Sequence, residues 1–82
     1  MSMRLKIVSP AKVEFLGDIS SVLVPGVNGQ FEILKDHAPI ISALQKGKVV
    51  YQPLEQEERI ALEISGGFVE VQKNVVSLCV EL

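Results

Sequence analysis

The sequence predicts an all-β fold, a two-sheet β-sandwich of about nine or ten short strands with no substantial helix. Apolar and polar residues alternate in several short runs, as in strands with one buried face. Turn-forming residues separate these runs at intervals of roughly 8–10 residues. No window carries apolar residues at the 3.6-residue period over the roughly 10 residues that a helix needs.

The first strands are predicted from alternation near the N-terminus. Residues 3–7 alternate apolar and basic side chains, and Ser9-Pro10-Ala11 ends this run. Residues 13–15 alternate again, and Gly17-Asp18 is expected to turn the chain. Two separate strands are therefore expected before residue 19.

The next pair of strands is expected to form a tight hairpin. Residues 19–24 are rich in β-branched side chains and end at Pro25-Gly26. Asn28-Gly29 is a dipeptide that accepts positive φ and suits a tight connection. Residues 31–34 then form a short strand.

The middle of the chain is less regular. Residues 40–44 fit either a strand or one helical turn, and Ile40-Ile41 favours the strand. Lys46-Gly47 turns the chain into a strand at residues 49–51. Residues 53–58 form a polar, acidic loop.

Three strands are predicted in the C-terminal part. Residues 60–64 alternate, and Ser65-Gly66-Gly67 allows a sharp corner. Residues 68–72 form the next strand, Lys73-Asn74 turns the chain, and residues 75–80 form the last strand. The outward face of that last strand is less polar than solvent exposure would require, so a neighbouring strand or a partner is expected to cover it.

Size and composition predict one domain over residues 1–82. Hydrophobic residues make up 48% of the chain, and the mean hydropathy is +0.33. For so small a domain, these values indicate either a dense core or apolar surface that meets a partner.

Several classes of function are disfavoured. The formal net charge of −2 gives no cationic surplus for nucleic acid. No apolar run approaches the roughly 20 residues that span a bilayer, so no direct membrane insertion is expected. One cysteine, Cys79, and one histidine cannot form a disulfide or a zinc site, and no cofactor or metal is expected. The lone cysteine fits a reducing compartment.

Two residues raise alternative functions. His37 is a possible general base, but no nucleophile stands in a recognisable motif, so no catalytic residue is assigned. Lys35 lies between two predicted strands, as the modified lysine of a lipoyl or biotinyl carrier domain does. The usual neighbours of such a lysine are missing, and Pro39 would distort a symmetric hairpin. The carrier remains the alternative hypothesis.

A series of short motifs in fixed order carries a family resemblance. They are Val24-Pro25-Gly26, Asn28 to Leu34, His37-Ala38-Pro39, Leu44 with Gly47, Ser65 to Val71, and Asn74-Val75-Val76. From Met3 to about Val80, this series resembles the N-terminal β-sandwich domain of the epsilon subunit of F-type ATP synthase.

The resemblance implies a non-catalytic rotor subunit of the central stalk. Such a subunit binds the gamma subunit and the c-ring, and couples ion-driven rotation to ATP synthesis at the cytoplasmic face of the bacterial inner membrane. By position, the implied c-ring contacts are Val27, Asn28, Gly29 and Gln30. The implied gamma-subunit contacts are His37, Ala38, Pro39, Ile41 and Ser42.

The sequence departs from the family pattern at three places. Lys35-Asp36 stands where Pro-Gly is common, so the backbone of this corner is expected to differ. Gln30 replaces a frequent acidic residue, which predicts a ring contact less dependent on charge. The C-terminal helical hairpin of most members is absent from this sequence, so its inhibitory role is not expected here.

Overall fold

The computed structural model describes residues 2–82, and its regular secondary structure in that range is β-strand. The fold class predicted from the sequence is confirmed, with eight strands in the described residues in place of nine or ten. The strands are β1 (Met3–Val8), β2 (Val13–Gly26), β3 (Gly29–Leu34), β4 (Ile40–Leu44), β5 (Gly47–Pro53), β6 (Ile60–Ile64), β7 (Gly66–Gln72) and β8 (Val75–Glu81).

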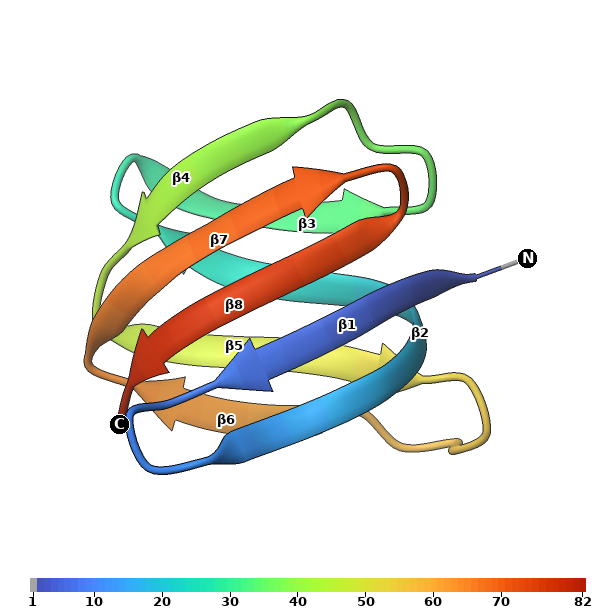
Figure 1. Cartoon of the computed structure of the whole chain (residues 1–82), viewed down its shortest axis with the longest axis horizontal. Helices are drawn as coiled ribbons and strands as arrows, with labels where there is room; N and C mark the ends of the chain where they lie inside the picture. Colours follow the sequence, from blue (N-terminus) through green and yellow to red (C-terminus); the bar gives the residue numbers. More distant parts are fainter. Residues whose placement is uncertain (1) are drawn as a thin grey trace.

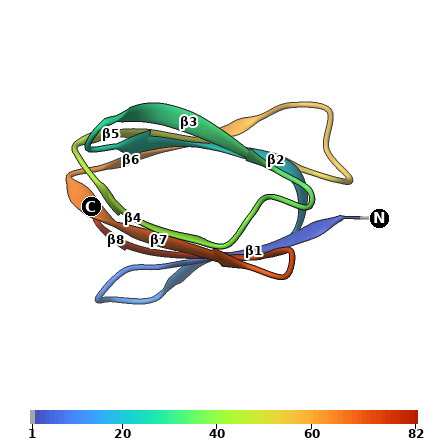
Figure 2. The same cartoon turned by 90° about the horizontal axis from the view of Figure 1, so that it is seen from above.

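The strands form two facing layers (Figures 1 and 2). One layer has the order β4-β7-β8-β1, in which β1 and β8 run parallel and the other neighbours antiparallel. The second layer has the order β3-β2-β5-β6 and is antiparallel throughout. The N-terminal half of β2 also pairs with β1, so β2 connects the two layers on one side.

The predicted turn at Gly17-Asp18 was wrong, because both residues are extended within the 14-residue strand β2. Gly17 pairs with Leu5, and Asp18 pairs with Arg4, whose guanidinium lies 3.4 Å from the Asp18 carboxylate. The ring of Phe15 covers the position that a side chain on Gly17 would take, 3.1 Å from the ideal Cβ. Pairing with β1 therefore outweighs the turn propensity of this dipeptide.

The core lies between the two layers, and its described residues are apolar apart from the hydroxyl of Tyr51. Alternate residues of each strand point inward, which is why the alternation in the sequence predicted the strands. The aromatic rings of Phe15 and Tyr51 meet at a centroid distance of 4.6 Å. The buried residues are Met3, Leu5, Ile7, Ile19, Val22, Val24, Ile33, Leu44, Val49, Tyr51, Ile64, Val69, Val71, Val76, Leu78 and Val80.

Two tight hairpins lie where the sequence predicted that the chain turns. In the β7–β8 hairpin, Lys73 and Asn74 have φ of 52° and 62°, a pattern that matches the twist of the flanking strands. In the β2–β3 hairpin, only Gly29 of the Asn28-Gly29 pair has positive φ, at 122°. Both connections are short and fix the register of their strands.

The connections gather at two opposite ends of the sandwich (Figure 1). The β1–β2, β2–β3, β4–β5 and β6–β7 connections lie at one end. The β3–β4 corner, the β5–β6 loop and the β7–β8 turn lie at the other. Strand β4 runs along the open edge from the second end to the first.

Candidate interaction surface

The two predicted sets of contacts lie at opposite ends of the sandwich (Figure 1). Residues 27–30 form the tip of the β2–β3 hairpin, which we call the hairpin tip. Residues 37–39 belong to the connection between β3 and β4, which we call the corner. No single flat partner surface can cover both sets of residues.

The hairpin tip is exposed but firmly held. Val27 is 49% exposed, and its backbone N–H donates to the carbonyl of Ala43 at 3.1 Å. The N–H of Gln45 donates to the carbonyl of Pro25 at 2.8 Å. These bonds tie the hairpin to the end of β4, so the tip presents Val27 and Gln30 on a rigid base.

The corner is shaped by an unusual backbone conformation. Asp36 has φ of 65°, a left-handed conformation that costs non-glycine residues energy but that Asp and Asn tolerate best. The N–H of His37 donates to the carbonyl of Leu34 at 3.1 Å. The His37 ring Nδ1 lies 2.7 Å from the carbonyl oxygen of Ala38. Asp36 thus takes the conformation of a glycine.

The placement of Lys35 removes the basis of the carrier hypothesis. A carrier lysine lies at the tip of a hairpin, between two strands that pair. Here β3 pairs with β2, and β4 pairs with β7, so Lys35 lies between strands that do not pair. Its Nζ lies 4.0 Å from the Asp36 carboxylate.

Ile41 and Ser42 lie on opposite faces of β4. Ile41 is 73% exposed and pairs with Glu70 on the outer face of the sheet. Ser42 pairs with buried Val69, so its half-buried side chain lies on the inner face. Of these two predicted contacts, only Ile41 is presented to a partner that lies flat on this sheet.

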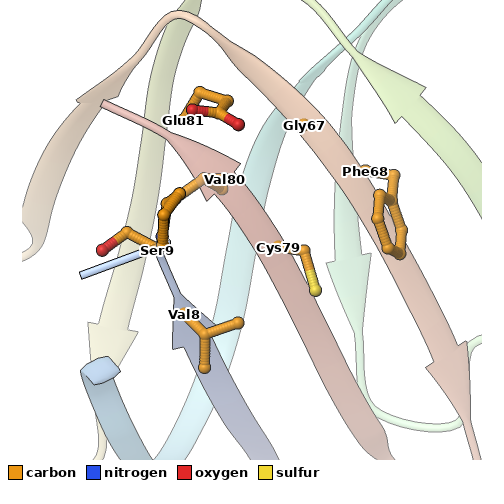
Figure 3. A pocket seen from close by; sticks show the side chains of 8 residues that line it. Val8, Ser9, Gly67, Phe68, Cys79, Val80 and Glu81 are labelled. Carbon is orange, nitrogen blue, oxygen red and sulfur yellow. The ribbon is translucent and has the colours of Figure 1, made fainter. Parts of the chain in front are cut away.

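One row of apolar residues crosses the outer face of this layer. Ala43 pairs with Phe68, Phe68 with Cys79, and Cys79 with Val8, so four adjacent strands contribute to the row. Phe68 is 48% exposed. Figure 3 shows Phe68, Cys79 and Val8 on three neighbouring strands around a shallow hollow of about 310 Å³. We call Val8, Ile41, Ala43, Phe68 and Cys79 the apolar face.

A more polar row borders the apolar face on the same sheet. It contains Glu70, Ser77 and Lys6, which follow Ile41 across the strands. A second shallow hollow, lined by Pro39, Ile41, Glu70 and Gln72, extends the surface toward the corner. The corner and the apolar face therefore form one continuous surface.

Sequence reasoning identified only part of this surface. The weakly polar side of the last strand, where Cys79 lies, was noted from its alternation. Ile41 was named as a contact because of the family resemblance. Phe68 and Val8 were missed, because their alternation shows that they face outward but not that β7 and β1 flank β8. The structure shows that no strand of the described chain covers this side of β8 (Figure 2).

No group of three or more His, Cys, Asp or Glu side chains in residues 2–82 could hold a metal ion. In the same range, no helix is long and apolar enough to cross a membrane. Within residues 2–82, the His37 side chain has one hydrogen bond, between its ring Nδ1 and the neighbouring Ala38 carbonyl.

The fold and this surface define a small β-sandwich domain with one uncovered apolar sheet face. Residues 2–82 match the family model described as the ATP synthase delta/epsilon chain β-sandwich domain. The chain belongs to this family. It is 46% identical over 77 residues to the ATP synthase epsilon chain of Chlorobaculum tepidum, covering 94% of this chain and 86% of that one.

Further relatives agree with this assignment. The epsilon chain of Chlorobium limicola is 42% identical and covers 95% of this chain, which spans 88% of that protein. The epsilon chain of Leptospira borgpetersenii is 37% identical over 76 residues, and this chain spans 58% of its length. The Leptospira borgpetersenii protein is therefore considerably longer than the present chain.

Solved structures confirm the fold. A chain in the mitochondrial ATP synthase of Euglena gracilis superposes with a TM-score of 0.88 at 18% identity, over 96% of this chain and 50% of that one. A chain of the Tetrahymena thermophila mitochondrial ATP synthase central stalk and c-ring gives a TM-score of 0.84 at 16% identity, over 100% and 65%. At these identities, the likeness is one of fold.

Proposed function

We propose that this chain is a non-catalytic rotor subunit of the central stalk of an F-type ATP synthase. It binds the gamma subunit through the corner and the apolar face, and the c-ring through the hairpin tip. In this role it couples ion-driven rotation of the ring to ATP synthesis. Its place is the cytoplasmic face of the bacterial inner membrane, where it is held through the complex.

The apolar face is the observation that best supports the proposed contact with the gamma subunit. Isolated apolar side chains on a surface are ordinary, but a row across four paired strands is a contiguous patch. Ile41 and Phe68 are large and exposed, so a protein partner that packs on the apolar face would remove their side chains from water. Their polar border of Glu70 and Lys6 fits the rim of such an interface.

The hairpin tip has a different character, which suits a smaller contact with polar loops. Gln30 brings no charge, and Lys46 and Lys48 line the same shallow groove as Gln30. In this proposal, the contact forms without an acidic side chain at position 30. Val27 supplies exposed apolar area beside these polar groups.

The architecture between the two contacts supports a mechanical role. Strand β4 extends from the corner to the hairpin tip, and it is bonded to β7 along its length. At its far end, Leu44 pairs with Gly26, the last residue of β2 before the tip. Force applied at one contact therefore reaches the other through paired strands rather than through loops.

Reconstitution of the complete complex tests this proposal. Bacterial membranes stripped of their own epsilon chain are supplied with this chain, and ATP-driven ion pumping is measured. We expect pumping to recover and Val27→Asp to impair that recovery, with Leu54→Asp as the control because Leu54 is equally exposed on the β5–β6 loop. If the folded wild-type chain neither binds nor restores pumping, the proposal is wrong.

A further inference from the structure

Asn74 and Asp36 join two connections that are far apart in the sequence. The Asp36 N–H donates to Asn74 Oδ1 at 2.6 Å, and Asn74 Nδ2 donates to Asp36 Oδ1 at 2.9 Å. The two residues are 38 positions apart. Two reciprocal bonds between one pair of residues fix both distance and orientation, as in a capping box.

The anchor for this pair is itself fixed. Asn74 lies in the tight β7–β8 turn, and its carbonyl accepts a hydrogen bond from the Arg4 N–H at 2.9 Å. The side-chain amide of Asn74 therefore projects from a turn that is held by β1, β7 and β8. Asp36, by contrast, lies in a connection between two strands that do not pair with each other.

We infer that Asn74 is a positioning residue for the corner. By bonding both the backbone and the side chain of Asp36, it holds the left-handed conformation at φ 65° and thereby sets the direction of the chain through His37, Ala38 and Pro39. These residues continue into Ile41, so Asn74 aligns the corner with the apolar face. We call the two reciprocal hydrogen bonds between Asp36 and Asn74 the clasp. The inference rests on the proposed function for the identity of the partner, but the clasp itself is a property of the free chain.

Asn74→Gly tests the inference, because glycine accepts φ of 62° and removes only the side-chain amide. Lys73→Gly is the matched control, since Lys73 lies in the same turn at φ 52° and is not part of the clasp. We expect amide exchange at Asp36 to accelerate at least about ten-fold in Asn74→Gly, and the Kd for purified gamma subunit to rise several-fold. Lys73→Gly should leave both within about two-fold of wild type.

A charge-conserving exchange provides the rescue. Asn74→Asp alone places two carboxylates together and should weaken binding of gamma. Adding Asp36→Asn returns one amide and one carboxylate to the pair, so affinity and exchange protection should recover. Recovery would separate the clasp from a general effect on the turn.

The outcomes that overturn the inference are distinct from failure of the proposed function. Equal exchange at Asp36 in Asn74→Gly and Lys73→Gly would show that Asn74 does not hold the corner. Faster exchange with an unchanged Kd for gamma would show that the corner needs no positioning. If wild-type chain binds no gamma, the proposed function fails, and exchange in the free chain still decides whether the clasp holds.

Discussion

Gly67 lies so close to Cys79 that a single added carbon would overlap the Cys79 carbonyl oxygen. The two residues belong to the paired strands β7 and β8, and Gly67 has φ of 147°, a conformation that L side chains rarely adopt. This close approach brings β7 against β8 next to the Phe68–Cys79 pair of the apolar face. The glycine is therefore required by the strand pairing that builds the surface.

Gly67→Ala should lower the free energy of unfolding by about 2–4 kcal/mol, because both the overlap and the φ angle oppose a side chain. The neighbouring Gly66→Ala is the control. A Cβ there would meet only the Leu44 carbonyl at 3.7 Å, an ordinary contact, so its cost should stay below about 1 kcal/mol. Urea unfolding measures both values, and equal costs would contradict this account of Gly67.

Val27→Asp should separate ring contact from folding. Val27 is 49% exposed and its side chain is not part of the core, so its unfolding free energy should change by less than about 0.5 kcal/mol. Binding to purified c-ring should nevertheless weaken, since a charge replaces apolar contact area. A large loss of stability in urea unfolding would instead assign Val27 a structural role.

The ionisation of Tyr51 is expected to change the free energy of unfolding at high pH. Burial, and to a smaller extent the charge of Glu14, raises the pKa of Tyr51 above its ordinary value of 10.0. The folded state then holds the proton more tightly than the unfolded state. This stabilisation is complete below the ordinary pKa and is lost as pH rises through the raised one.

Tyr51→Phe should therefore lose less stability between pH 8 and about pH 11 than wild type does. Each protein is compared with its own value at pH 8, which removes any baseline effect of the hydroxyl. All other side chains are common to both proteins, so the difference between the two losses reports on the Tyr51 hydroxyl. Equal losses would show that Tyr51 ionisation does not contribute.

The strands could be predicted from the sequence because the core is built from alternate residues. Residues 3–7 and 60–64 show this directly, and both are strands with alternating burial. The turn predicted at Gly17-Asp18 was wrong, because the local sequence does not show that these residues pair with Leu5 and Arg4. The outcome there was decided by tertiary context rather than by propensity.

The surface was harder to predict than the strands. Alternation marks Val8 and Phe68 as outward-facing, yet their proximity depends on β1 and β7 flanking β8 in the sheet. The clasp between Asp36 and Asn74 could not be predicted from the sequence either, because the two residues are 38 positions apart. At the corner, Asp36 takes the left-handed conformation that a glycine would take, and its hydrogen-bond partner lies in a distant turn.

The most direct measurement of the central claim is calorimetric binding of this chain to purified gamma subunit. The comparison uses wild type, Ile41→Asp on the apolar face, and Leu54→Asp, which is 50% exposed on the β5–β6 loop. We predict that wild type and Leu54→Asp bind with equal affinity and that Ile41→Asp binds at least about ten-fold more weakly. The account is contradicted if Ile41→Asp binds gamma as tightly as wild type does, or if Leu54→Asp no longer binds gamma.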